Sequence, residues 1–328
     1  MGEAMGFRLL VLTNLETPAS VDMVRGWPEQ LQAQIPGLET HLADSTEEAS
    51  DVIGQVDAIY GKVDPDAFAK AGELRWIQSP LAGPQPSFYH RALVESDVVV
   101  TNMRGIFSDH IGAHVLAFIL AFARGLPTYV TMQRDRRWRP DVPTVHLPEA
   151  TALVVGVGAI GAEVARLCAA FGMAVTGVDP RETAAPEGVG RLVGPEALDE
   201  VLPTADFVIV TVPETPATQG LFDAARFARM KPSAFFINIG RGATAELDDL
   251  NAALRSGVLA GAALDVFQIE PLPVGHPLWN APGMVITPHV AAAGPYLNER
   301  RTEVFFDNCR RFSAGRELRS VVDKANWF

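Results

Sequence analysis

The sequence has few cysteines and no long apolar run. Its 328 residues include two cysteines, Cys168 and Cys309, which lie far apart and outside any C-x-x-C pattern. This spacing excludes a disulfide framework and favours two buried thiols in a reducing compartment. The longest apolar stretch, Ile111–Ala123, contains His114 and is shorter than the roughly 20 residues that a membrane-spanning helix needs. Residues 1–6 lack the basic start and apolar core of a secretion signal, so we expect a cytoplasmic protein without a membrane partner.

The chain also lacks an excess of positive charge. It carries 27 Lys and Arg against 39 Asp and Glu, a formal net charge of -12, which excludes a general attraction to nucleic acid. An anionic substrate must therefore be held by a local cation. The pair Gly61-Lys62 lacks the upstream glycine of a P-loop, and no G-x-S-x-G hydrolase motif is present. His110 and His114 have a metal-like spacing but no H-E-x-x-H motif and no third ligand, so no metal site is predicted.

Short apolar runs alternate with helix-like segments along most of the chain, and 48% of the residues are apolar. Compact apolar runs are typical of parallel strands buried on both faces, and their alternation with helices predicts an α/β fold. The predicted strands are Phe7–Thr13, Val56–Tyr60, Leu74–Gln78, Val98–Thr101, Ala152–Val155, Val175–Val178, Phe207–Val210, Phe235–Ile239, Gly261–Val266 and Val285–Thr287. The predicted helices are Ser20–Ile35, Ile106–Arg124, Gly161–Phe171, Glu196–Leu202, Ala224–Met230, Leu247–Ser256 and Leu297–Phe312.

The alternation changes near Asn102, and this change predicts two domains. A long helical pattern and an arginine-rich turn at Arg134–Arg139 follow, and the strand–helix alternation then resumes until the break at Gly294-Pro295. The block from about 105 to 293 is predicted to be a complete doubly wound parallel-sheet domain.

A glycine-rich turn lies where this second block begins. Gly156, Gly158 and Gly161 form a G-x-G-x-x-G motif that follows a predicted strand and opens a predicted helix. In this context Gly156 allows a tight turn, Gly158 lets the backbone approach a pyrophosphate, and Gly161 lets helix and strand pack closely. The N-terminus of a helix favours phosphate groups, so the turn with Ala159 and Ile160 predicts a dinucleotide site.

An acidic residue follows the next predicted strand. Asp179 would accept hydrogen bonds from the adenosine ribose hydroxyls and repel a 2′-phosphate, so it favours NAD over NADP. Arg181 would suit a 2′-phosphate, but we interpret it as a solvated turn residue. The alternative is that the glycines form a purely structural turn beside a surface aspartate.

Three further residues follow the late strands of the second block: Arg241, Glu270 and His289. Because ligands bind outside the carboxyl ends of strands in open α/β sheets, we expect the three to converge beside a nicotinamide. An arginine holds a carboxylate with a two-pronged fork, and a histidine donates protons near neutral pH. A carboxylate such as Glu270 orients the imidazole and favours its charged form. The alternatives are a turn arginine, a structural histidine and a turn-capping glutamate.

Together these motifs resemble the D-2-hydroxyacid dehydrogenase family, which includes phosphoglycerate, glyoxylate/hydroxypyruvate and D-lactate dehydrogenases. The resemblance covers nearly the whole chain and is strongest from Val154 to Pro288. The segments that carry it are Val155–Gly161, Val212–Thr218, Ile237–Gly242, Ala263–Leu272 and Thr287–Ala291.

The resemblance implies a role for each site residue. Arg241 would bind the substrate, His289 would be the acid/base, and Glu270 would pair with it. Asp265 would lie near the nicotinamide amide. The residues implied to line the cofactor cleft are Val212, Pro213, Thr218 and Ile239.

The resemblance also implies the domain plan. Residues 1–103 and 294–328 would form a discontinuous, flavodoxin-like substrate domain that closes over the cofactor, and residues 104–293 would form the NAD-binding Rossmann domain. A homodimer would be built around the helix Ile106–Arg124, with Trp138 near the interface.

In the substrate loop, the backbone N–H groups of Ala82 and Gly83 would receive the substrate carboxylate. The family usually has further donors in this loop, whereas Pro84 supplies no N–H. The family also has a glutamate before His114, where this chain has Ala113.

The predicted function is hydride transfer between NAD(H) and a small 2-oxo or 2-hydroxy acid of the D-series, with reduction as the favoured direction. Two alternatives stay open at this point. One is an NAD-sensing binding protein like the corepressors related to this family, and the other is a relative of formate or phosphonate dehydrogenases.

Overall fold

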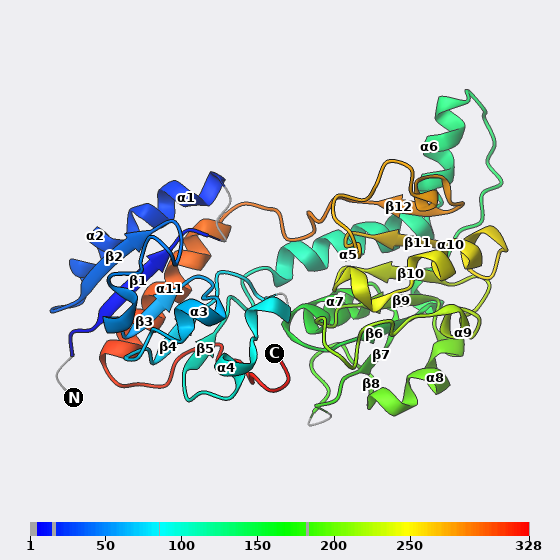
Figure 1. The fold of residues 1–328 in the computed structure, drawn as a ribbon. Helices are drawn as coiled ribbons and strands as arrows, with labels where there is room; N and C mark the ends of the chain where they lie inside the picture. Colours follow the sequence, from blue (N-terminus) through cyan, green and yellow to red (C-terminus); the bar gives the residue numbers. More distant parts are fainter. Residues whose placement is uncertain (1–4, 15–17, 85, 182–183, 328) are drawn as a thin grey trace. The chain divides into compact units, whose positions relative to one another are not determined.

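The computed structural model describes residues 5–14, 18–84, 86–181 and 184–327. The chain forms two compact units: unit 1 is Met1–Ile106 with Gly294–Phe328, and unit 2 is Phe107–Ala293. Each unit is a parallel sheet covered by helices, as Figure 1 shows. The α/β fold class predicted from the sequence is confirmed.

Unit 1 contains a five-stranded parallel sheet in the order β2-β1-β3-β4-β5, which is the flavodoxin-like order. Its strands are β1 Arg8–Leu12, β2 Glu39–Ala43, β3 Ala58–Tyr60, β4 Trp76–Gln78 and β5 Val99–Thr101. Strand β2 was not predicted because this edge strand is partly exposed and has no apolar run. The central strand β1 is buried from Leu9 to Leu12, as its apolar pattern predicts.

The helices of unit 1 are α1 Pro18–Arg25, α2 Trp27–Gln32, α3 Pro65–Phe68, α4 Arg91–Val94 and α11 Leu297–Ser313. The prediction of one helix over Ser20–Ile35 was wrong, because the helix is interrupted at Gly26 and a second helix begins with Pro28 in its first turn. Trp27 is fully buried, with its ring centroid 4.9 Å from that of Tyr60 and 5.0 Å from that of Phe305 on α11. This aromatic contact joins the two parts of the sequence that form unit 1.

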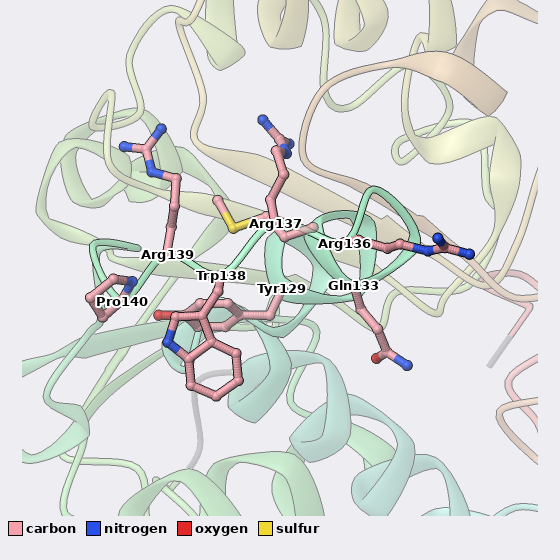
Figure 2. Close-up of a pocket in the computed structure, with 8 residues that line it drawn as sticks. Tyr129, Gln133, Arg136, Arg137, Trp138, Arg139 and Pro140 are labelled. Atoms are coloured by element: carbon pink, nitrogen blue, oxygen red, sulfur yellow. The ribbon is translucent and has the colours of Figure 1, made fainter.

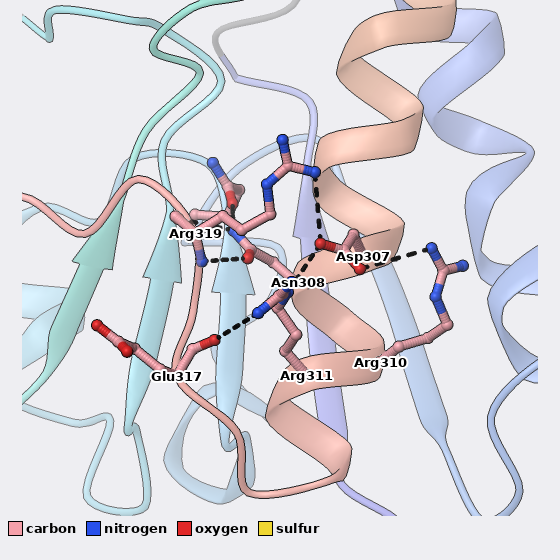
Figure 3. Close-up of polar contacts among 7 residues, drawn as sticks. Asp307, Asn308, Arg310, Arg311, Glu317 and Arg319 are labelled. Atoms are coloured by element: carbon pink, nitrogen blue, oxygen red, sulfur yellow. Dashed lines mark hydrogen bonds and ion pairs between the residues drawn. The ribbon is translucent and has the colours of Figure 1, made fainter.

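Polar contacts tie the C-terminal tail to α11, as Figure 3 shows. Asp307 accepts a hydrogen bond from Arg311 at 2.8 Å and pairs with Arg319 at 3.4 Å. Burial acts to raise the pKa of Asp307, but these two arginines outweigh it and hold the pKa below its usual range. Asn308 accepts from the backbone N–H of Arg319 and donates to Gln78, the last residue of β4. The tail is therefore fastened beside the strand that leads into the predicted substrate loop.

Unit 2 contains a seven-stranded parallel sheet in the order β12-β11-β10-β9-β6-β7-β8. Its strands are β6 Thr151–Val155, β7 Ala174–Val178, β8 Arg191–Val193, β9 Phe207–Val210, β10 Phe235–Asn238, β11 Gly261–Leu264 and β12 Met284–Ile286. The chain runs outward from β6 to β8 and then returns to the other side of β6 at β9. Ligands of doubly wound sheets bind at the carboxyl ends of the strands where the order reverses, here β6 and β9. The short edge strand β8 was missed because it is mostly exposed.

The helices of unit 2 are α5 Ser108–Ala123, α6 Leu126–Arg134, α7 Ala159–Ala170, α8 Leu198–Val201, α9 Ala224–Phe227 and α10 Leu247–Arg255. Among α5 to α10, α5 and α7 contribute to the core on one face of the sheet, and α8, α9 and α10 contribute to the core on the other. Helix α6 was not predicted, since none of its residues is buried, and in Figure 1 it stands away from the sheet. Short 3-10 turns lie at Ile53–Gln55, Pro86–Phe88, Leu147–Glu149, Pro195–Ala197, Leu202–Thr204, Gly242–Thr244 and Pro277–Asn280.

Within the described ranges, no single helix has both the length and the apolar character needed to cross a membrane. Helices α5 and α6 meet those two criteria only when they are joined, and they are bent by 67° at their junction.

Candidate active site

Six strands of unit 2 end in register at one edge of the sheet. The paired last residues are Val155, Val178, Val210, Asn238, Leu264 and Ile286. The residues that follow them are therefore brought to one edge, and they are Gly156, Asp179, Thr211, Ile239, Asp265 and Thr287. The residues singled out from the sequence of unit 2 lie in this row or within a few positions of it. Parallel register thus gathers segments that are far apart in the chain.

The glycine-rich turn packs closely against its neighbours at Gly156 and Gly161. Gly156 has a φ of +93°, and a Cβ there would lie 2.8 Å from Val212 Cγ1. A Cβ on Gly161 would lie 2.0 Å from the carbonyl oxygen of Gly156, so this position requires glycine. Gly158 is the N-cap of α7, and it offers no side-chain cap to the first N–H groups of that helix. The backbone from Gly158 to Gly161, with Ala159 and Ile160, therefore suits a phosphate group.

Asp179 lies at the carboxyl end of β7 with both carboxylate oxygens in use. One oxygen accepts from the backbone N–H and Nε of Arg181 at 3.0 and 2.9 Å. The other accepts from Val157 N at 2.8 Å and from the Arg181 guanidinium at 3.0 Å. Burial acts to raise the pKa of Asp179, but the hydrogen bonds from Arg181 and Val157 outweigh it and keep the pKa below its usual range.

Arg181 is solvent-exposed, with 46% of its side chain accessible, which agrees with its interpretation as a solvated turn residue. Its guanidinium forms a two-pronged ion pair with Asp179, and a nitrogen of that group lies 3.6 Å from the position of a Cβ on Gly158. The cation is therefore held between the acidic residue and the glycine-rich turn.

The segment that follows β9 closes over the glycine turn. Thr211 donates its hydroxyl hydrogen to the carbonyl oxygen of Gly156 at 2.5 Å. Thr218 donates to the carbonyl oxygen of Pro213 at 2.7 Å and accepts from Thr215 N at 2.8 Å. The hydroxyl of Thr218 therefore shapes this loop from within. Thr211 was missed in the sequence, where only its position directly before Val212–Thr218 pointed to it.

Arg241 follows β10, and its backbone is held by two buried polar residues. Ile239, the residue that follows the strand, is 6% exposed. Asn238 Nδ2 and Thr244 Oγ1 both donate to the carbonyl oxygen of Arg241, at 3.0 and 2.7 Å. Asn238 also accepts from Gly240 N at 3.0 Å. These two anchors were not predicted, although both lie within three residues of Arg241.

The turn that carries Arg241 packs against the segment that carries Glu270. A Cβ on Gly242 would lie 1.9 Å from the carbonyl carbon of Phe267, so the two backbones are in direct contact. Phe267 N in turn donates to Oε1 of Glu270 at 2.9 Å. The turn that follows Arg241 therefore packs on the backbone of the segment to which Glu270 is bonded.

Glu270 and His289 form the predicted pair, with Oε2 of Glu270 2.7 Å from Nδ1 of His289. An ionised carboxylate only accepts hydrogen bonds, so Nδ1 of His289 carries a hydrogen and donates it to Glu270. His289 has a φ of +54°, which is uncommon for a residue with a side chain. Its N–H donates to the carbonyl oxygens of Asp265 and Thr287 at 2.8 and 3.1 Å, which holds this conformation in place.

Asp265 is 1% exposed and anchors the same turn through its side chain. Its carboxylate accepts from Thr287 Oγ1 at 2.6 Å and from the backbone N–H groups of Val290 and Ala291, both at 2.9 Å. A buried carboxylate with three donors is well satisfied. Asp265 thus fixes the backbone on both sides of His289.

The model of the D-isomer specific 2-hydroxyacid dehydrogenase, NAD binding domain, matches residues 116–291. The chain belongs to the D-isomer specific 2-hydroxyacid dehydrogenase family. It is therefore an NAD(P)-dependent oxidoreductase, and its unit 2 contains the NAD-binding domain of the family.

Relatives of this dehydrogenase include named reductases. A glyoxylate/hydroxypyruvate reductase A from Yersinia enterocolitica is 35% identical over 212 residues, which cover 64% of this chain and 66% of the relative. A glyoxylate reductase from Pyrococcus furiosus is 30% identical over 287 residues, which cover 85% and 84%. The crystal structure of a D-isomer specific 2-hydroxyacid dehydrogenase from Xanthobacter autotrophicus, in complex with NADPH and MES, is 32% identical with a TM-score of 0.85 and coverage of 98% and 99%.

The other predicted substrate residues of the dehydrogenase lie in unit 1, directly after β4. Asn102 Nδ2 donates to the carbonyl oxygen of Ala82 at 2.8 Å, and Met103 N donates to that of Leu81 at 3.2 Å. These bonds fix the Ala82-Gly83 peptide at the carboxyl edge of the unit 1 sheet. Its role in binding a carboxylate stays a prediction.

The described residues of the dehydrogenase contain no group of three or more His, Cys, Asp and Glu side chains arranged to hold a metal ion.

Proposed function

We propose that this dehydrogenase reduces a small 2-oxo acid, of the glyoxylate and hydroxypyruvate class, to the corresponding D-2-hydroxy acid. The observation that carries the proposal is the 2.7 Å contact between Glu270 and His289, in a segment packed against the Arg241 turn at the carboxyl edge of the sheet. The named reductases among its relatives support this substrate class.

Each member of the trio has a distinct task in this proposal. The reduced nicotinamide, when bound, supplies the hydride that adds to the carbonyl carbon. Arg241 holds the substrate carboxylate and polarises the carbonyl through the same planar fork. His289 donates the proton from Nε2 to the carbonyl oxygen, so that an alcohol results, and Glu270 stabilises the charged imidazole before the transfer. In the oxidation direction, neutral His289 takes the proton back.

The residues of unit 2 fit a dinucleotide. In this proposal the uncapped N-terminus of α7 at Gly158 binds the pyrophosphate, and Asp179 binds the adenosine ribose. We propose NAD(H) as the cofactor, with NADP(H) also accepted because the Arg181 guanidinium lies beside the same position. On the nicotinamide side, the residues we propose to line the cleft are Val212, Pro213, Thr218, Ile239 and Asp265.

We propose a second copy of the chain as the partner of the α6 arm, which we define as Leu126–Pro140. Leu126 and Val130 are half exposed and Trp138 is 98% exposed, which is unusual for large apolar side chains. Figure 2 shows residues that line a hollow of about 630 Å³ at this arm, Tyr129 and Trp138 among them. A dimer would cover this apolar surface, and helix α5 leads directly into the arm. Both free cysteines are buried, which suits a reducing cytoplasm.

The decisive experiment is a panel of 2-oxo acids with the purified chain. Glyoxylate, hydroxypyruvate and pyruvate are tested with NADH and with NADPH, and the oxidation of the cofactor is followed by absorbance. We expect turnover with glyoxylate or hydroxypyruvate, and we expect reduction to prefer lower pH than oxidation because only charged His289 donates a proton. NADH binding without turnover of any acid would instead support the NAD-sensing alternative, and reduction of NAD by formate would support a formate dehydrogenase.

A further inference from the structure

A histidine on the first helix of unit 2 reaches the carboxyl edge of the sheet. His114 of α5 has its Nε2 atom 3.1 Å from Thr287 Oγ1 and 3.8 Å from Asp265 Oδ1. Its ring packs edge-on against Phe118, with the centroids 4.6 Å apart. The side chain of His114 is 22% exposed, so most of it is shielded by these neighbours. The mechanism above gives this residue no task.

The direction of the hydrogen bonds follows from the number of hydrogens available. Both oxygens of Asp265 accept backbone N–H groups, as an ionised carboxylate does, so the carboxylate has no hydrogen to give to Thr287. The single hydroxyl hydrogen of Thr287 therefore points to Asp265, at 2.6 Å. Thr287 Oγ1 can only accept from His114, so Nε2 of His114 carries a hydrogen. This is the opposite tautomer from that of neutral His289.

The series of hydrogen bonds from His114 through Thr287 and Asp265 ends at the turn that carries His289. The Asp265 carboxylate holds the N–H groups of Val290 and Ala291, and its own backbone carbonyl holds the N–H of His289. The positive φ of His289 is costly and persists only where its surroundings enforce it. The orientation of the Asp265 carboxylate is in turn set by Thr287, and Thr287 is held by His114.

Helix α5 provides a rigid base for this contact. A Cβ on Gly112 would lie 2.9 Å from Leu167 Cδ1 and 3.0 Å from Glu163 Cγ, so α5 and α7 are in close contact one half-turn before His114. The absence of a side chain at Gly112 therefore allows α5 to pack closely on α7. His114 therefore contacts Thr287 from a helix that is packed against α7.

We propose that His114 is a positioning residue for the reduction, which acts through Thr287 and Asp265 to set the turn that presents His289. The proposal rests on the proposed role of His289 as the proton donor. His114 itself does not touch the reacting atoms in this scheme.

Two matched pairs of variants test the proposal. His114→Gln keeps an N–H donor near the position of Nε2, and His114→Leu removes it. Thr287→Ser keeps the hydroxyl, and Thr287→Val removes it at nearly the same shape. We expect the Leu and Val variants to lower kcat on the order of tenfold, because small misplacements of a catalytic group are costly. The Gln and Ser variants should stay close to the wild type, and NADH binding should change less than about twofold in all four, well short of a tenfold change in affinity.

The double variant His114→Leu/Thr287→Val separates coupling from general damage. Because the proposed path from His114 to Asp265 runs through Thr287, the kcat of the double variant should fall no further than that of the worse single variant. Losses that multiply, or equal losses in the Gln and Leu variants, would overturn the proposal.

Two readouts do not depend on turnover. The first readout is the nitrogen NMR spectrum of histidine-labelled protein, in which the signals of His114 are identified by their loss in His114→Gln. These signals should show the tautomer with hydrogen on Nε2. A hydrogen on Nδ1 alone would contradict the proposal. Hydrogen exchange at Val290 and Ala291 should be faster in His114→Leu than in His114→Gln, and unchanged exchange would also overturn it. If the wild type reduces no 2-oxo acid, the proposed function fails, while these two measurements still decide whether His114 sets the turn.

Discussion

The Oε2 atom of Glu270 lies 2.7 Å from Nδ1 of His289, while Oε1 of the same carboxylate accepts the backbone N–H of Phe267 at 2.9 Å. One oxygen therefore orients the imidazole, and the other ties the glutamate to its own loop. The loop packs on the turn of Arg241 through Gly242. This relationship couples the proposed proton donor to the proposed substrate cation through backbone contacts and not through flexible side chains alone.

Replacement of Glu270 by Gln removes the negative charge beside His289 and keeps the shape. We expect kcat for reduction to fall on the order of a hundredfold, the scale of general acid–base catalysis, because the charged imidazole loses its stabilising partner. NADH affinity, measured by fluorescence titration, should stay unchanged. Glu149→Gln, at an 82% exposed side chain, is the matched control and should behave as the wild type. A Glu270→Gln enzyme with normal turnover would remove the pair from the mechanism.

The Arg241→Lys variant tests the two-pronged contact with the substrate. One ammonium group cannot reproduce the fork of a guanidinium, and the loss of one charged hydrogen bond corresponds to about tenfold in affinity. We therefore expect KM for the 2-oxo acid to rise about tenfold or more, with little change in NADH binding. Arg91→Lys, at an 88% exposed side chain, is the control for a surface change of the same kind. Unaltered KM and kcat would place Arg241 outside the site.

Removal of the Arg181 side chain by Arg181→Ala should separate the two cofactors. We expect kcat/KM with NADPH to fall about tenfold or more, because the 2′-phosphate loses a charge-assisted contact. The value with NADH should fall less, since the Asp179 carboxylate becomes available to the ribose. Calorimetry with adenosine 2′,5′-bisphosphate gives a second reading that needs no turnover. Equal losses with both cofactors would mean that Arg181 serves only the structure of the turn.

The two cysteines should be inert in the folded protein. Burial raises the pKa of the Cys168 thiol to about 12, and burial also raises that of Cys309 well above its ordinary value. Because a raised pKa keeps a thiol protonated below that value, little thiolate is present at neutral or mildly alkaline pH. A thiol reagent should label neither cysteine in the native protein and both after unfolding in guanidinium. Rapid labelling of the native protein would contradict the burial of these side chains.

The α6 arm should control the oligomeric state. Light scattering is expected to give twice the mass of one chain for the wild type. Trp138→Glu places a charge on the most exposed large apolar residue of the arm and should shift the mass toward one chain. Val274→Glu is the matched control, since Val274 is 96% exposed and lies outside the arm. A wild type that is monomeric at all concentrations would refute the proposed dimer.

Several elements were missed or misdrawn in the sequence for local reasons. The edge strands β2 and β8 are partly exposed, so they lack the apolar run that marks a buried strand. The first helix was drawn through Gly26, since the mixed polarity of Ser20–Ile35 continues across the break between α1 and α2. None of the residues of helix α6 is buried, so its sequence has no apolar stripe that would predict a helix.

The sequence by itself determined the glycine-rich turn, the strands around it and the positions of Arg241, Glu270 and His289 after their strands. These features are local or follow from parallel register, which carries the ends of the strands to one edge whatever the intervening chain does. Tertiary structure alone decided the contact of His114 with Thr287, 173 residues away, and the anchoring of His289 by Asp265. It also decided that the Arg181 guanidinium folds back onto Asp179. Side-chain contacts of this kind depend on rotamers and on the packing of α5 against α7, and no spacing in the chain encodes either.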